Sequence, residues 1–175
     1  DTESNGSSED TSTESSTGGS PSDADTLIVG DVAGLENLDP AMVSAVVSYH
    51  ILENTQERLF NITPELEIET ELATDLEISN GGTTWTMPIR EGVQFHEPFK
   101  RELIAQDFVD AYEWIADSEN GSPYVSRFSS VDEMIAQDDY TLQFELSAPV
   151  TDLKIYLAKQ GLGIWPMEAR EGDHD

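Results

Sequence analysis

The residues that could do chemistry gather in one stretch, where Arg90, Glu91 and His96 fall within seven positions. An imidazole beside a carboxylate can act as a general base or bind a metal. Base catalysis needs a nucleophile in a recognisable setting, and no serine signature accompanies His96 while cysteine is absent from the chain. The other histidines, His50 and His174, have no metal-ligand spacing to it. We therefore expect His96 to be a packed or hydrogen-bonded side chain.

Carboxylates are the second group to weigh, because two acids in a cleft can cleave a glycosidic bond. Asp107, Asp110 and Glu113 are spaced to share one face of a helix. In a chain with 36 acids this spacing predicts a solvated face rather than a catalytic pair. The Asp138-Asp139 pair is better explained by a hairpin turn.

Three further features also have a structural explanation. Arg90 ends a predicted strand and is expected to pair with one of the acids, while Gly92 is expected to supply a turn. Trp85, Trp114 and Trp165 could line a ligand groove, but their strand and helix spacing favours core packing. Since a nucleophile signature, a metal spacing and a glycine-rich phosphate loop are all lacking, we expect no enzyme and no metal site. An acidic hydrolase is the least favoured alternative.

The composition limits the class of partner. The chain has 36 Asp and Glu against 8 Lys and Arg, a formal charge of −28 and a pI near 4.1. This charge repels phosphate, so we expect no nucleic acid partner and no direct adhesion to anionic lipid. Because such a chain repels itself at low salt and is relieved by screening, we interpret it as a halophilic protein. A very soluble protein with an acidic tail is the alternative.

Residues 1–25 are predicted to be a disordered Ser/Thr-rich acidic stalk. They carry seven acids, no basic residue and only one clearly apolar residue, Ala24, so they cannot bury enough surface to offset chain entropy. A plain disordered terminus is the alternative. A stalk is useful if the chain is tethered by a lipid anchor upstream of Asp1, and we expect such an anchor. The remaining residues still have a formal charge of −21.

A folded domain is predicted over residues 26–169, followed by a polar tail at 170–175. Residues 26–31 are a short apolar run, which predicts a buried strand. Asp39-Pro40 is a typical helix start, with an N-cap oxygen followed by a proline that needs no amide hydrogen. We expect that helix to end near Leu59.

Two hairpins and a second helix are predicted further along. Residues 76–89 alternate about Asn80-Gly81-Gly82, which indicates a hairpin. Pro88 has no amide hydrogen and is expected at a sheet edge. Residues 104–115 have apolar side chains at helical spacing, and residues 131–146 alternate on either side of a polar turn.

Taken in order, these segments resemble the extracellular solute-binding proteins of peptide and nickel ABC importers, family 5. The loop at 96–103 departs from the family pattern, with a basic Lys100-Arg101 pair. The resemblance spans about residues 26–169 and rests on five stretches: LENLDP at 35–40, ELATDLEISNGGTTWTMPIREGVQFHE at 71–97, IAQDFVDAYEW at 104–114, DDYTLQFELSAPV at 138–150 and GIWPMEA at 163–169.

The resemblance implies an α/β fold of the type II periplasmic-binding-protein kind, of which this chain holds the first lobe only, a mixed sheet with hairpins and packing helices. It also implies the substrate-binding component of an ABC importer. Such a protein captures peptides or similar small solutes outside the cell and delivers them to permease subunits. It would be an extracellular lipoprotein tethered to the membrane, with no cofactor and no chemistry of its own.

The resemblance also separates scaffold from ligand contact. The stretch 85–97 and the helix after it correspond to scaffold. The ligand-facing loop is expected at Val32, Ala33, Gly34 and Leu35, because ligands of open α/β sheets lie beyond the carboxyl ends of strands. Family members are much longer and close two lobes on a ligand, whereas this chain ends inside the first lobe. A truncated first-lobe product that binds no solute, a surface or interaction module, is therefore the alternative.

Overall fold

The computed structural model describes residues 30, 34–35, 37–159 and 161–171. The stalk predicted at 1–25 and nearly all of the strand predicted at 26–31 lie outside these residues. Within the described part, no helix combines the length and the apolarity that crossing a membrane requires.

A four-stranded antiparallel sheet organises the fold, in the order β3-β4-β6-β5. Its strands are β3 (Glu77–Ser79), β4 (Thr84–Pro88), β5 (Val131–Asp138) and β6 (Thr141–Leu146). Both predicted hairpins are confirmed, because β3 pairs with β4 around the 3-10 turn η1 (Asn80–Gly82) and β5 pairs with β6. Gly81 has a φ of 72°, a left-handed conformation that glycine adopts without steric cost.

The prediction that Pro88 lies at a sheet edge is wrong, because β4 is an interior strand between β3 and β6. Pro88 is the last residue of β4 and lies opposite Thr141. On the β6 side of β4, the next hydrogen bond is made by the Ile89 N–H, which donates to the Tyr140 carbonyl at 2.8 Å. The missing proline hydrogen therefore leaves the ladder to β6 intact.

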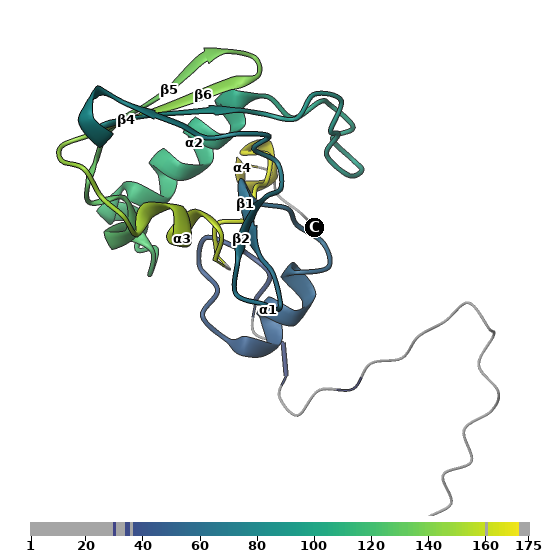
Figure 1. Ribbon diagram of the computed structural model, residues 1–175. Coiled ribbons are helices and arrows are strands. Elements are labelled where there is room, and N and C mark those ends of the chain that lie inside the picture. Colours follow the sequence, from purple (N-terminus) through teal and green to yellow (C-terminus); the bar gives the residue numbers. More distant parts are fainter. Residues whose placement is uncertain (1–29, 31–33, 36, 160, 172–175) are drawn as a thin grey trace, which may run out of the picture. The chain divides into compact units, whose positions relative to one another are not determined.

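The helix α2 (Ala105–Ala116) packs on one face of this sheet, against β5 and β6 (Figure 1). This confirms the helix predicted at 104–115. Phe108, Tyr112 and Ile115 are fully buried at helical spacing. The Tyr112 ring centroid lies 6.3 Å from that of Phe144 on β6, and the Tyr112 hydroxyl donates to the Leu162 carbonyl at 3.2 Å. The core therefore joins the sheet, α2 and the C-terminal segment.

The helix α1 (Val46–Leu52) and a small hairpin of β1 (Phe60–Ile62) and β2 (Ile68–Thr70) precede the larger sheet. The prediction of a helix from Asp39-Pro40 to near Leu59 is wrong at both ends. Asp39 closes a turn instead: its carbonyl accepts the N–H groups of residues 42 and 43, each at 3.0 Å, and its side chain accepts that of residue 41 at 3.0 Å. An aspartate that satisfies the backbone locally competes with helix formation.

The remaining elements are short. The 3-10 helices η2 (Ser118–Asn120) and η3 (Val125–Phe128) precede β5, while α3 (Leu153–Leu157) and α4 (Glu168–Glu171) follow β6. Residues 161–166, between α3 and α4, are buried. In α4, the Arg170 guanidinium lies 3.5 Å from the Trp114 ring centroid and donates to Asp39 Oδ1 at 2.6 Å. This bond joins the first described turn to the last described helix.

Candidate ligand-binding cavity

A cavity of about 440 Å³ opens between segments that are far apart in the sequence. This volume falls within the roughly 300–1,000 Å³ of small-molecule sites. The wall is made of residues 53–57 after α1, Glu71 and Leu72 after β2, residues 93–97 with Phe99 and Leu103 before α2, and residues 164–166 before α4.

Backbone hydrogen bonds fix three of these walls. The Ile164 N–H donates to the Glu57 carbonyl at 2.9 Å, which joins the C-terminal wall to the segment after α1. The loop 93–103 folds back on itself, with the Leu103 N–H bonded to the Val93 carbonyl at 2.8 Å and the Phe95 N–H bonded to the Arg101 carbonyl at 3.0 Å. The loop is therefore a short antiparallel finger with defined backbone geometry.

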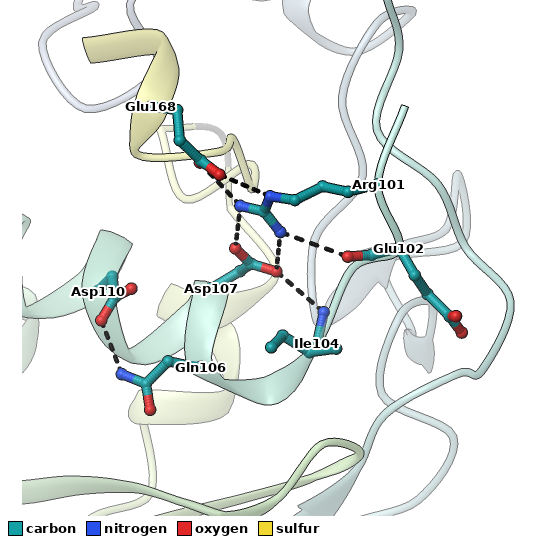
Figure 2. A network of polar contacts seen from close by, with 7 residues as sticks. All are labelled: Arg101, Glu102, Ile104, Gln106, Asp107, Asp110 and Glu168. Carbon is teal, nitrogen blue, oxygen red and sulfur yellow. Dashed lines mark hydrogen bonds and ion pairs between the residues drawn. The ribbon is translucent and has the colours of Figure 1, made fainter. Parts of the chain in front are cut away.

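Arg101 anchors this finger to two other elements (Figure 2). Its Nη1 and Nη2 donate to Asp107 Oδ2 and Oδ1 at 2.9 and 2.6 Å, and its Nε and Nη2 donate to Glu168 Oε1 and Oε2 at 2.7 and 2.8 Å. Both carboxylates are held in the bidentate geometry that suits a guanidinium. The Arg101 Cζ also lies 4.8 Å from the ring centroid of Phe95, which lines the cavity.

Asp107 has two partners and is buried, so the prediction that it belongs to the solvated face of the helix is wrong. Only 5% of the residue is exposed, and its Oδ2 also accepts the Ile104 N–H at 2.9 Å, at the start of α2. A carboxylate at this position satisfies a helix N–H that lacks an intrahelical acceptor. Asp110 and Glu113 are exposed as predicted, and Asp110 accepts a 2.7 Å bond from the Gln106 side chain.

The network shifts the pKa of its charged groups. Hydrogen bonds to Glu168 and then to Asp107 raise the pKa of Arg101, although burial opposes the shift. The hydrogen bonds from Arg101 lower the pKa of Glu168 to about 2. At neutral pH the guanidinium and the Glu168 carboxylate are therefore both charged.

The cavity wall is rich in carboxylates. Within the described part of the chain, the lining contains no lysine or arginine and contains four acids, Glu53, Glu57, Glu71 and Glu97. Glu71 accepts the Arg58 N–H at 2.9 Å, and Arg58 Nε lies 3.7 Å from the same oxygen. Burial raises the pKa of Glu71, and the contacts with Arg58 oppose the shift. Glu97 forms an exposed ion pair with Lys100.

Arg90, Glu91 and His96 are all exposed. His96 is not packed, because its side chain is exposed and lines the cavity, but the residue is hydrogen-bonded through its carbonyl, which accepts the Phe99 N–H at 3.1 Å. Arg90 is exposed, and within the described residues no carboxylate forms an ion pair with it, so its predicted pairing with an acid stays a prediction. Gly92 forms the predicted turn, with a φ of 75°, and its N–H donates to Glu102 Oε1 at 2.7 Å.

The tryptophans pack largely as predicted. Trp85 and Trp165 are 2% and 7% exposed, and Trp114 is half-buried beneath the Arg170 guanidinium. Trp165 also lines the cavity, so one of the three contributes to a groove as well as to the core.

Of the predicted ligand-facing loop, Val32 and Ala33 lie outside the described residues. Gly34 and Leu35 are exposed, and neither lines the cavity. The loop therefore stays a prediction.

Sequence reasoning missed the residues that support the cavity, above all Arg101, Asp107 and Glu168. The role of Asp107 could have been predicted from the sequence, because an acid three residues after a helix start can accept backbone N–H bonds there. The signal for Arg101 was weaker. The basic pair at 100–101 stood out only as a departure from the family pattern. Nothing local predicted the bond to Glu168, which is 67 residues away.

Residues 67–173 match the bacterial extracellular solute-binding proteins, family 5, middle region. This match covers more than half of the chain, and the chain belongs to this family. The family consists of binding proteins, which agrees with the expectation that the chain is not an enzyme.

One curated protein and two solved structures are also similar to this chain. The oligopeptide-binding protein OppA of Bacillus subtilis (strain 168) is 30% identical over 128 residues, which is 65% of this chain and 23% of that protein. The structure of Haemophilus influenzae OppA in complex with RPPGFSPFR has a TM-score of 0.71 at 23% identity, over 78% of this chain and 30% of that one. The structure of the periplasmic binding protein DppA from Helicobacter pylori in complex with the peptide STSA has a TM-score of 0.68 at 28% identity, over 77% and 29%.

These similarities confirm the expected fold class, a partial lobe of the periplasmic-binding-protein kind. The chain spans only 23% to 30% of the length of the three relatives.

Proposed function

We propose that this chain is part of the substrate-binding component of an ABC importer, which captures peptides or similar small solutes outside the cell and delivers them to permease subunits. The family match over residues 67–173 carries the proposal. Two relatives with peptides bound in their structures support a peptide as the solute.

This chain would supply a preformed surface that contacts one side of the solute. A binding protein of two lobes responds to its ligand because contacts on both lobes favour the closed state. The cavity walls at 53–57, 93–97 and 164–166 offer apolar area and polar groups for one side of such a contact. The loop of Val32, Ala33, Gly34 and Leu35 is a second proposed contact.

The proposed location is the outer face of the cell membrane. A lipid anchor upstream of Asp1 would hold the protein there, and residues 1–25 would act as the spacer between anchor and fold. Their Ser, Thr and acidic composition suits a solvated stalk.

Tryptophan fluorescence tests the proposal. The protein isolated from membranes of the source organism is titrated with peptides of increasing length, and with sugars and single amino acids for comparison. We expect saturable changes with peptides, because Trp165 lies in the cavity wall. A Trp165→Phe variant shows which part of the signal comes from the cavity.

A protein that binds none of these solutes would contradict the proposal. The alternative, a first-lobe product without solute binding, would then be favoured.

A further inference from the structure

We infer that the cavity selects solutes that carry an ammonium or guanidinium group on an apolar body. This inference rests on the proposed function, because it names the class of solute for the same site. It follows from the arrangement of charge and apolar surface in the cavity wall.

The charge of the wall is negative even after its ion pairs are counted. Four carboxylates line the cavity, and two of them, Glu71 and Glu97, have the cationic partners Arg58 and Lys100. Glu57 lines the cavity and is exposed, and no described cation forms an ion pair with it. The wall therefore keeps negative charge that a cationic solute would offset.

Acidic lining alone would mean little in a chain with 36 acids. The second observation is that apolar and aromatic side chains form the rest of this wall. Phe95, Phe99 and Trp165 lie in it together with Leu72, Leu103 and Ile164. An apolar floor with carboxylates around it fits an amphipathic cation better than a small inorganic ion, which would gain nothing from the apolar surface.

The aromatic rings of the wall already attract cations within the protein. The Arg101 Cζ lies 4.8 Å from the Phe95 ring centroid, and the Arg170 Cζ lies 5.1 Å from that of Trp165. These contacts show that ring faces at this site are compatible with guanidinium groups. An anionic solute would instead face the carboxylates without compensation, and a neutral solute would desolvate them without an opposite charge.

Matched peptides test the inference at one fixed ionic strength and at pH 7. The first is a capped, neutral tripeptide with a central Phe. The second is the same capped peptide with one residue changed to Arg, and the third is the neutral peptide with a free amino terminus. We expect both cationic peptides to bind about tenfold more tightly than the capped neutral one. The stronger of the two identifies guanidinium or ammonium as the preferred group.

Two variants that each remove one negative charge show whether the preference for cationic solutes arises in the cavity. Glu57→Gln is expected to weaken binding of the cationic peptides by about three- to tenfold, and not to weaken binding of the neutral peptide, which no longer desolvates that carboxylate. Glu65→Gln is the control, because it removes the same charge from an exposed residue that does not line the cavity. Equal affinities for the three peptides, with no effect of Glu57→Gln, would overturn the inference while the proposed function stands.

A small amine separates the two proposals further. If no peptide binds, the proposed function fails, and phenethylamine then tests the cavity by itself. Binding of phenethylamine that is weakened by Glu57→Gln but not by Glu65→Gln would support the inference. No binding of phenethylamine in that case would overturn it as well.

Discussion

At the level of single residues, Arg101 connects three elements near the cavity. It joins the finger 93–103 to the start of α2 through Asp107 and to α4 through Glu168. The two ion pairs differ in environment, because the Asp107 side chain is 7% exposed and the Glu168 side chain is 52% exposed. Breaking the ion pair with the buried Asp107 costs more free energy of folding, because removing one partner leaves a desolvated charge.

Replacing Arg101 should therefore destabilise the fold. We expect Arg101→Ala to lower the free energy of unfolding by about 2–4 kcal/mol, because the Asp107 carboxylate loses its cation. Arg101→Lys should cost less, since it keeps the charge and loses the bidentate geometry. Urea unfolding in molar salt measures both. The control is Arg90→Ala, an exposed arginine without a described ion pair, with an expected change within about 0.5 kcal/mol. Similar losses for the two alanine variants would contradict the role of Arg101.

Glu168 predicts a pH dependence. Its pKa is lowered from 4.5 to about 2 by Arg101, so its contribution to stability is present above pH 4.5 and is lost as the pH falls toward 2. Because the side chain is 52% exposed, screening reduces this contribution to on the order of 1 kcal/mol. The free energy of unfolding of wild type minus that of Glu168→Gln should shrink between pH 5 and pH 2. A difference that does not change over this range would exclude the ion pair as its source.

At the scale of elements, the accuracy of sequence reasoning depended on how local the signal was. Both hairpins and α2 were predicted, because strand alternation and helical spacing are read within one segment. The first helix was misplaced, because Asp39 closes a turn and α1 starts only at Val46. The cavity could not be predicted, because its walls are brought together only by the fold. The same is true of the bond between Arg101 and Glu168.

The packing of α2 on the sheet gives a second stability prediction. Phe144 of β6 is fully buried against Tyr112, so we expect Phe144→Ala to cost about 3–5 kcal/mol through lost contacts and a cavity. Ile78→Ala on β3 is the comparison, because Ile78 is 51% exposed. Its expected cost is below about 1 kcal/mol. Urea unfolding followed by near-ultraviolet circular dichroism measures both, and a larger loss for Ile78→Ala would argue against this core.

At the scale of the whole molecule, charge is the dominant property. The formal charge of −28 on 175 residues leaves most carboxylates without a cation, because only 8 Lys and Arg are available. Repulsion among them opposes the compact state and is screened over about 10 Å at 0.1 M salt and about 3 Å at 1 M.

The protein should therefore fold better in high salt. We expect weakened or lost structure in dilute buffer and recovery in molar KCl, followed by far-ultraviolet circular dichroism. Sucrose at matched osmolality is the control, because it does not screen charge and should restore less structure. A flat response to salt would refute the halophilic interpretation.

The size and the bound solute of the native protein decide whether this chain is part of a peptide-capturing receptor. An antibody raised against residues 26–60 is used to isolate the reactive protein from membranes of the source organism. Its mass is measured, and the small molecules released on denaturation are identified by mass spectrometry. We expect a protein several times larger than 19.3 kDa that releases peptides. A protein of 19.3 kDa that releases none would contradict it.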